Sequence, residues 1–434
     1  MSGGFVALRG AALSFRADPF AEPSGEAMVH DSDAIVLMEG ERIAAFGPAA
    51  AIAPRLPPNV PVHHFPSGTL VPGFIDCHVH FAQIGIVGAC GHGLLEWLEQ
   101  YTFPEERRFE DPAHAAQAAR LFLADLVRQG TTTAAVYGTV HEASVDTLFE
   151  QAQGSHLRII AGKALMDRNA MPALCDTAQG GYDASERLIT RWHGKGRLGY
   201  AVTPRFVATS TPDQLEAARA LREKYPGCWL QSHLSETMAE VGWVHQLYPR
   251  CIDYVDVLES FGLLGPRAIY GHAIHITHRE RLRLASTDTA VAHCPTSNLF
   301  LGSGLFDLAG AKSAVGGIRV GLATDVGAGT TLSMLKTMGA AYQVARLRGG
   351  HLSPAQALWL ATGGAAQALG LDMTVGNLRR GLDADVVVLD PSAIDWLDWR
   401  CRNARDAHDW LGAMMTAGDD RVVAAVYAAG RRVK

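Results

Sequence analysis

Short apolar runs alternate with helical patterns through the central part of the chain. One helix start is clear at Thr211-Pro212 with Gln214, which combines a capping box with a proline at the first helical position, and the same pattern recurs from Ser353. Alternating strands and helices are typical of parallel sheets. Eight candidate strands predict an α/β fold, a (β/α)8 or TIM barrel, whose chemistry lies at the C-terminal ends of the strands. These candidates are residues 74–80, 131–137, 158–164, 198–203, 229–234, 268–272, 289–293 and 319–325.

Both ends of the chain have a different pattern, with short apolar runs separated by turns at residues 5–15, 34–46, 385–390 and 421–428. Five prolines predict a stiff connector that breaks strands, namely Pro54, Pro57, Pro58, Pro61 and Pro66. We therefore expect a small composite β-domain, a β-sandwich, from residues 1–70 and 374–434. Residues 71–373 are expected to form the barrel domain.

Composition narrows the class of protein. The 434 residues are 48% apolar and 19% charged, which is enough for a large buried core. A net charge of -6 argues against a strong phosphate-binding surface, so nucleic acid is not an expected partner. We expect no membrane partner and no signal peptide, because no apolar run is long enough to span a bilayer and charges interrupt the first residues. Seven cysteines without a C-x-x-C pair suggest reduced thiols in a cytoplasmic protein.

Metal-binding side chains fall at the ends of four expected strands. The first strand ends in His78-Val79-His80, and both imidazoles can reach one ion because residues two apart lie on the same side of a strand. His233 ends the fifth strand, His272 the sixth and Asp325 the eighth. Imidazoles and a carboxylate with an open position for water suit a catalytic zinc or iron. The alternative is a set of core histidines and a surface aspartate.

Glu236 lies three residues after His233. A carboxylate in the loop after a strand-end ligand can lie beside the ion without binding it, which suits a proton shuttle. The alternative is an ordinary glutamate at a helix start.

The segments that carry these residues resemble the amidohydrolase superfamily, in the right order through the whole barrel. They are PGFIDCHVH at 72–80, QSHLSE at 231–236, GHA at 271–273, HCPTSN at 293–298 and TD at 324–325. Within that superfamily, further segments are similar to the guanine deaminases: FAQ at 81–83, LLEWL at 94–98 with YTFP at 101–104, and TPRF at 203–206. The resemblance implies hydrolysis of guanine, a small-molecule substrate, to xanthine and ammonia.

The resemblance also implies roles for the strand-end residues. His78, His80, His233 and Asp325 resemble the ligands of one zinc ion per chain, for which Fe²⁺ is the alternative. The ion would bring the pKa of a bound water to about 7. His272 resembles the residue that orients and polarises this water, and related enzymes count it as a ligand.

The resemblance implies that two carboxylates share the proton transfers. Asp325 would take the water proton, and Glu236 would protonate a ring nitrogen and then help ammonia to leave. His80, His233, Glu236 and Asp325 would also contact the substrate.

Four more residues are candidates for binding the purine. Guanine presents acceptors at O6 and N7, to which Arg205 can donate in a bidentate fork; the alternative is a structural salt bridge. Gln83 is expected to bond to the purine edge. Phe206 and Trp97 are expected to stack on the ring, although aromatic residues more often belong to the core.

The long loop at 81–110 follows the first barrel strand. Loops of this length in compact domains are often lids. We expect Leu94, Leu95 and Leu98 to form its apolar underside.

Two other functions are compatible with these residues. Another hydrolytic deaminase or dechlorinase of the superfamily, acting on a pterin, triazine or adenine nucleoside, would keep every metal residue. A substrate without the O6 and N7 acceptors would give Arg205 nothing to hold. A non-catalytic barrel scaffold would be expected to have lost part of the metal set. A homodimer is implied by the resemblance alone.

Overall fold

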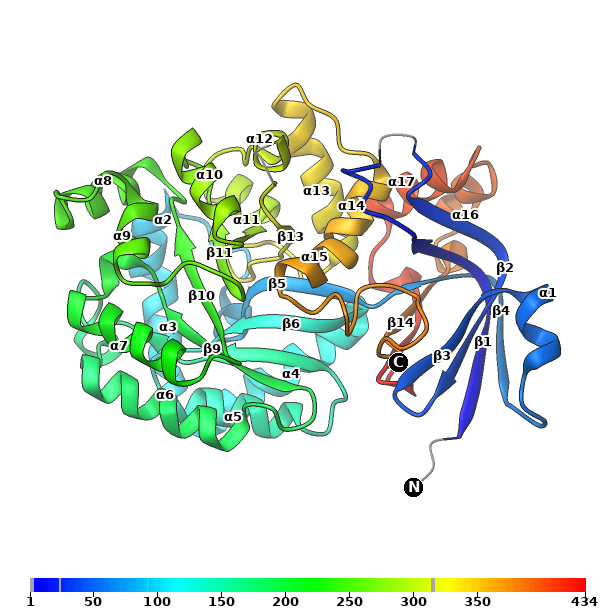
Figure 1. Cartoon of the computed structure of the whole chain (residues 1–434), viewed down its shortest axis with the longest axis horizontal. Helices are drawn as coiled ribbons and strands as arrows, with labels where there is room; N and C mark the ends of the chain where they lie inside the picture. Colours follow the sequence, from blue (N-terminus) through cyan, green and yellow to red (C-terminus); the bar gives the residue numbers. More distant parts are fainter. Residues whose placement is uncertain (1–3, 23–24, 92, 314–316) are drawn as a thin grey trace.

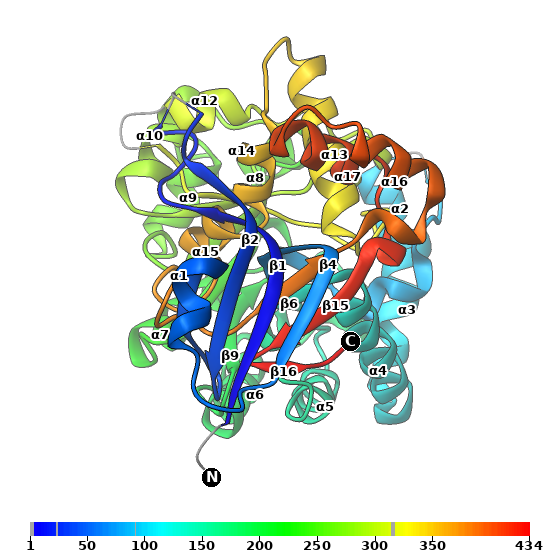
Figure 2. The ribbon, with the colours of Figure 1, turned by 90° about the vertical axis from the view of Figure 1, so that its right-hand side faces the viewer.

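The computed structural model describes residues 4–22, 25–91, 93–313 and 317–434. A barrel of parallel strands stands beside a separate mixed sheet, to which both ends of the chain contribute (Figure 1, Figure 2). The α/β barrel predicted from the sequence is confirmed.

The eight barrel strands follow one another in chain order, and every neighbouring pair is parallel. A short extra strand, β8 (Ala164–Leu165), pairs with β9. All eight lie within a few residues of the predicted segments. They are β5 (Phe74–His80), β6 (Thr131–Tyr137), β7 (Arg158–Gly162), β9 (Leu198–Pro204), β10 (Trp229–Leu234), β11 (Ala268–His272), β12 (Ala290–His293) and β13 (Val320–Leu322).

The barrel closes between β5 and the segment that follows β13. The backbone N–H of Asp325 donates to the carbonyl of His78 at 2.8 Å, and that of His80 donates to the carbonyl of Val326 at 2.7 Å. The buried Asp76 carboxylate adds a second link, because it accepts from the backbone N–H and the hydroxyl of Thr324. Closure therefore brings the aspartate of the eighth strand directly beside the two histidines of the first.

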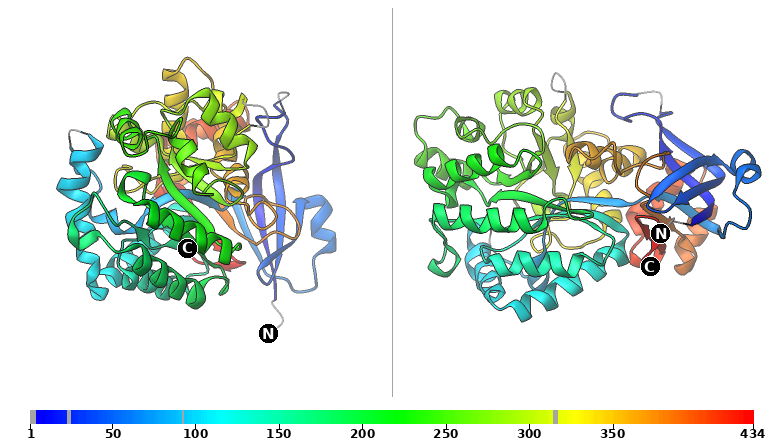
Figure 3. Two further views of the ribbon diagram at one scale, coloured as in Figure 1. Left: turned by 60° about the vertical axis from the view of Figure 1, so that its left-hand side comes forward. Right: turned by 60° about the horizontal axis from the view of Figure 1, so that its bottom comes forward.

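Helices surround the barrel strands (Figure 3). Their starts follow the sequence signals. At α7 the Thr211 hydroxyl accepts from the N–H of Gln214, and at α14 Ser353 and Gln356 form the full capping box. The predicted box at Thr211 is only half formed, because the Gln214 side chain donates to Asp176 instead, at 2.7 Å.

The helices over the barrel region are α2 (Leu94–Trp97), α3 (Phe103–Arg107), α4 (Pro112–Gln129), α5 (Glu142–Ala152), α6 (Ala178–Trp192), α7 (Pro212–Lys224), α8 (Met238–Leu247), α9 (Tyr254–Ser260), α10 (His278–Ser286), α11 (Pro295–Phe300), α12 (Leu308–Ser313), α13 (Met334–Leu347), α14 (Pro354–Leu360) and α15 (Gly363–Ala368).

The second sheet has the order β16-β15-β14-β4-β1-β2-β3. Leu8 and Val36 from one half share a buried cluster with Val386 and Tyr427 from the other. The small domain predicted from both ends is therefore one mixed sheet, and the strands form a single continuous order where the two packed sheets of a sandwich were expected. Its strands are β1 (Phe5–Phe15), β2 (Met28–Glu39), β3 (Arg42–Pro48), β4 (Val62–Pro72), β14 (Val386–Leu389), β15 (Val423–Ala428) and β16 (Arg431–Arg432), and α1 (Ala49–Ile52) follows β3.

The proline connector is shorter than predicted. β4 begins at Val62 and pairs with β1 as far as Leu70, where Pro66 was expected to prevent a strand. Pro66 lies in the stretch where the β1–β4 register shifts, and a residue without an N–H fits such an irregularity.

Two helices interrupt the C-terminal strands. α16 (Asp395–Arg402) and α17 (Ala407–Ala417) lie between β14 and β15, and α17 packs against α13 and α14 of the barrel. The division of the chain at 70/71 and 373/374 stays a prediction.

Candidate active site

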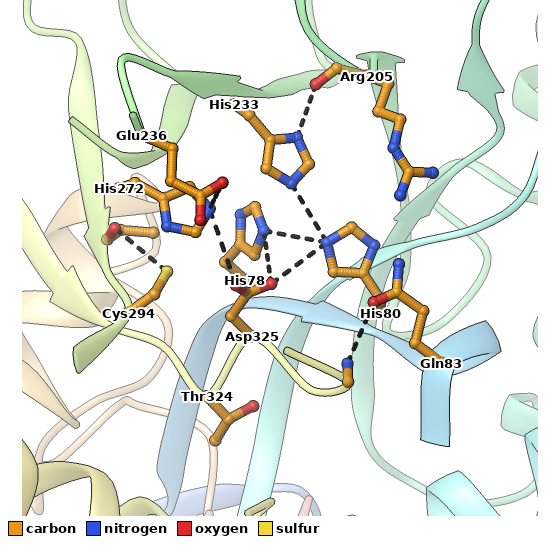
Figure 4. Close-up of polar contacts among 12 residues, drawn as sticks. His78, His80, Gln83, Arg205, His233, Glu236, His272, Cys294, Thr324 and Asp325 are labelled. Carbon is orange, nitrogen blue, oxygen red and sulfur yellow. Dashed lines mark hydrogen bonds and ion pairs between the residues drawn. The ribbon is translucent and has the colours of Figure 1, made fainter. Parts of the chain in front are cut away.

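The four residues predicted as metal ligands converge at the C-terminal end of the barrel (Figure 4). Nε2 of His80 lies 3.2 Å from Nε2 of His78 and 3.3 Å from Nε2 of His233. Oδ1 of Asp325 lies 3.2 and 3.3 Å from Nε2 of His78 and of His80. Two nitrogens that bind a tetrahedral zinc at its usual bond length are about 3.3 Å apart. The donor set therefore fits a single ion.

The protonation of these side chains also suits a metal. Nδ1 of His233 lies 2.7 Å from the carbonyl oxygen of Arg205 and donates to it, which leaves the Nε2 lone pair facing the cluster. Burial lowers the pKa of His78 to about 4 and, with the neighbouring histidines, holds the pKa of His233 well below its usual value. Burial raises the pKa of Asp325, but the histidines outweigh it and hold that pKa well below its ordinary value. Neutral imidazoles and a carboxylate are the forms that bind metal.

Backbone features that the sequence pattern does not show help to place these ligands. A Cβ on Gly271 would lie 2.6 Å from Cε1 of His78, so this position needs glycine. His272 and Asp325 have φ values of 70° and 50°, in the left-handed region that costs non-glycine residues about 1–3 kcal/mol. Backbone strain of this kind persists only where the surrounding fold holds it, and it is concentrated at functional sites.

His272 and Glu236 form a second group beside the ligands. Nε2 of His272 lies 3.5 Å from Glu236 Oε2 and 3.7 Å from Asp325 Oδ2. Burial raises the pKa of Glu236. Burial lowers the pKa of His272, but Glu236 and Asp325 outweigh burial and leave it above the usual value. The pair can therefore hold a proton next to the metal position.

Two residues orient this pair. Nδ1 of His272 lies 2.8 Å from Asn298 Oδ1, and the Ser303 hydroxyl donates to Glu236 Oε1 at 2.8 Å. Ser303 was missed by the sequence analysis, because a serine in a loop carries no signal of its own. Cys294 also lies near His272 and Asp325, but burial raises its pKa well above the usual value and keeps it a thiol.

A cavity opens beside the metal position. Its walls bring together every residue predicted to bind the substrate. They are Gln83, Trp97, Arg205, Phe206, His80, His233, Glu236 and Asp325, and they are joined by His272, Glu240 and several apolar side chains.

Arg205 and Gln83 share a partner that the sequence analysis missed. Nη1 of Arg205 donates to both oxygens of Glu106, at 2.9 and 2.7 Å, and Nε2 of Gln83 donates to Oε1 of Glu106 at 2.8 Å. Arg205 is therefore in a buried ion pair and also faces the cavity. Only the position of Glu106, two residues after Pro104 of the TFP segment at 102–104, could have drawn attention to it.

The loop at 81–110 is folded into short helical turns around α2 and α3. Leu94, Trp97 and Leu98 line the cavity, and the Trp97 indole N–H donates to the carbonyl of Ala89 at 2.8 Å. The prediction was wrong for Leu95, which is 38% exposed. Leu95 does not line the cavity, although its neighbour Leu94 does.

Comparison with known proteins agrees with this architecture. Residues 69–433 match the model of the amidohydrolase family. The chain belongs to the amidohydrolase family. This family is metal-dependent, in agreement with the His and Asp cluster.

This amidohydrolase is similar to the guanine deaminase of Escherichia coli (strain K12), with 45% identity over 401 residues that cover 92% of this chain and 91% of the relative. The solved structure of E. coli guanine deaminase superposes with a TM-score of 0.96 at 43% identity, covering 99% of both chains. Guanine deaminase from C. acetobutylicum, solved with guanine bound in its active site, gives a TM-score of 0.90 at 26% identity and covers 99% of this chain and 100% of the other.

A search of the described residues for membrane-spanning segments finds no helix that is both long enough and apolar enough to cross a bilayer.

Proposed function

We propose that this amidohydrolase is a guanine deaminase, a hydrolase that acts on a C–N bond of a cyclic amidine and converts guanine and water to xanthine and ammonia. The observation that carries the proposal is the cavity in which Arg205 and Gln83 face the converging metal ligands. The 45% identity to a guanine deaminase over most of both chains supports it.

We propose that His78, His80, His233 and Asp325 hold one zinc ion, with Fe²⁺ as the alternative occupant of the same donors. When bound, the ion supplies Lewis-acid chemistry that makes water acidic enough to ionise near neutral pH. Nε2 of His80 lies 3.2 Å from Nε2 of His78 and 3.3 Å from Nε2 of His233, which is close to the separation of two nitrogens on one tetrahedral zinc and supports this assignment.

The proton transfers fall to the residues of the chain. Asp325 accepts a proton from the attacking water, whose oxygen forms a bond to C2 of the purine. His272 orients that water. Its Nε2 lies 3.5 Å from Glu236 and 3.7 Å from Asp325, so it is close to both carboxylates that transfer protons. Glu236, with a raised pKa, gives its proton to the ring nitrogen. It then receives the water proton from Asp325 and gives it to the amino group. The C2–N bond breaks, ammonia leaves, and the proton of the new C2 hydroxyl returns to Glu236.

The purine would lie between the metal position and the loop at 81–110, called the lid segment below. Arg205 donates to the O6 and N7 acceptors, and Gln83 binds the adjoining edge. Phe206 and Trp97 stack on the ring. All four line the cavity, which supports this pose.

Ultraviolet absorbance of the purified protein with guanine tests the proposal, against adenine, cytosine, guanosine, a pterin and a triazine. We expect guanine alone to be converted, and Glu236→Gln to abolish turnover while keeping all four metal ligands. Glu223→Gln is the matched control, because that side chain is 66% exposed on α7.

Two outcomes would contradict the proposal in different ways. Turnover of a pterin, triazine or adenine nucleoside without guanine would keep the metal chemistry and discard the assigned roles of Arg205 and Gln83. Protein without metal and without turnover of any of these would indicate a scaffold.

We also propose a cytoplasmic homodimer with a composite β-domain from residues 1–70 and 374–434. The single sheet built from both ends supports the domain division. Light scattering tests the dimer, since a mass near 46.4 kDa would contradict it.

A further inference from the structure

Glu106 lies behind the wall of the cavity rather than in it. The side chain is 1% exposed and comes from α3, in the lid segment. Its two oxygens accept three hydrogen bonds, from Arg205 and Gln83. Both hydrogen bonds from Arg205 come from Nη1. Glu106 therefore holds the guanidinium and leaves Nη2 and Nε of Arg205 for another partner.

We propose that Glu106 is a positioning residue that also determines specificity. It fixes Arg205 and Gln83 against the O6 and N7 edge of the purine, and it cancels the charge of Arg205, so that the cavity favours the neutral substrate over the anionic product. This inference rests on the proposed deamination of guanine.

The positioning role follows from the shared hydrogen bonds. Arg205 comes from the end of β9 and Gln83 from the turn after β5, and Oε1 of Glu106 bonds to both. The other side of Gln83 is fixed as well, because its Oε1 accepts from the N–H of Gly327 at 3.3 Å. One carboxylate therefore sets the relative position of two side chains that would bind the same face of the substrate.

The specificity role follows from the acid–base chemistry of the reaction. Deamination replaces an amino group with a carbonyl, which withdraws electron density from the neighbouring ring N–H groups and delocalises the anion, so xanthine is a stronger acid than guanine. A fraction of the product is then anionic near neutral pH, while guanine is neutral. A buried arginine without a counter-ion would bind the anion preferentially. With Glu106 in contact, Arg205 donates hydrogen bonds at little net charge.

The experiment compares Glu106→Gln with wild type in the metal-loaded enzyme, with KM and kcat for guanine and the inhibition constant of xanthine measured from pH 6.5 to 9. Glutamine keeps the size and one acceptor but removes the charge. We expect the KM for guanine to rise about threefold and the xanthine inhibition constant to fall about tenfold where xanthine is anionic. The change in kcat should be smaller than either.

Two further variants separate the roles of Glu106. Glu106→Asp keeps the charge and loses reach, so it should raise KM for guanine while leaving xanthine inhibition near the wild-type value. Glu105→Gln is the matched control, because this neighbour on α3 pairs with Arg108 and His114 rather than with cavity residues. The other titratable groups facing the cavity are unchanged in every variant, namely His80, His233, Glu236, Glu240, His272 and Asp325.

Failure of this inference differs from failure of the proposed function. If wild type does not deaminate guanine, the function is wrong whatever the variants do. If wild type deaminates guanine and Glu106→Gln shows the same KM and xanthine inhibition as Glu105→Gln, the inference alone is overturned. Wild type offers a test even if Glu106→Gln does not fold: xanthine inhibition should not strengthen as xanthine ionises, and a marked strengthening would contradict charge cancellation.

Discussion

Gly271 sets how closely the backbone of β11 approaches a metal ligand. A Cβ at this position would lie 2.6 Å from Cε1 of His78, a distance that real side chains avoid. We expect Gly271→Ala to displace the imidazole of His78 and to lower the metal content of the purified protein several-fold. Inductively coupled plasma mass spectrometry measures this content. Gly242→Ala is the control, since a Cβ there meets nothing within 4 Å. Equal metal content in both variants would show that His78 does not depend on this approach.

Single residues differ in how well the sequence reveals them. His78, His80, His233 and Asp325 could be predicted because each is a metal-binding type at the end of a strand, and the fold collects strand ends. Glu106 could not be predicted, because a glutamate on a short helix is usually exposed to solvent. Its partners lie 23 and 99 residues away, and only the folded chain brings them together.

At the scale of elements, the lid segment offers a prediction about substrate binding. Trp97 is 2% exposed and lines the cavity, whereas Leu95 on the same helix points to solvent. We expect Trp97→Ala to raise the KM for guanine about tenfold, because it removes a stacking surface and admits water. Leu95→Ala should leave KM and kcat unchanged. The same steady-state values for both variants would show that the segment does not cover the substrate.

The strands and helices match the prediction where the hydrophobic pattern and the turn residues indicated the same element. The eight barrel strands are almost entirely buried runs bounded by helix signals, so their positions were predictable. β4 was not, because Pro66 argued against a strand and the register shift that accommodates it arises only on pairing with β1. α16 and α17 were not predicted between two strands of the second sheet, since α17 packs against α13 and α14, barrel helices distant in sequence, and α16 packs against α17.

For the whole molecule, the metal position coincides with the closure of the barrel. Asp325 follows the last strand and bonds through its backbone to His78 of the first, and His233 reaches the same point from the fifth. The ligands therefore come from strands that are far apart in the chain, and an ion bound by them ties the two edges of the barrel together. Binding of this kind stabilises only the folded state, because the unfolded chain does not hold the donors together.

Removal of the metal should therefore lower the stability of the whole chain as well as its activity. An ion at a thousand times its dissociation constant stabilises the folded state by about 4 kcal/mol. We expect exhaustive chelation to lower the unfolding temperature by several degrees, and added Zn²⁺ to restore it in a concentration-dependent way, measured by calorimetry. Glu236→Gln keeps every ligand and should show the same shift despite its lost activity. His233→Ala should show little shift. A chelator effect that persists in His233→Ala would mean that the stabilising ion binds elsewhere.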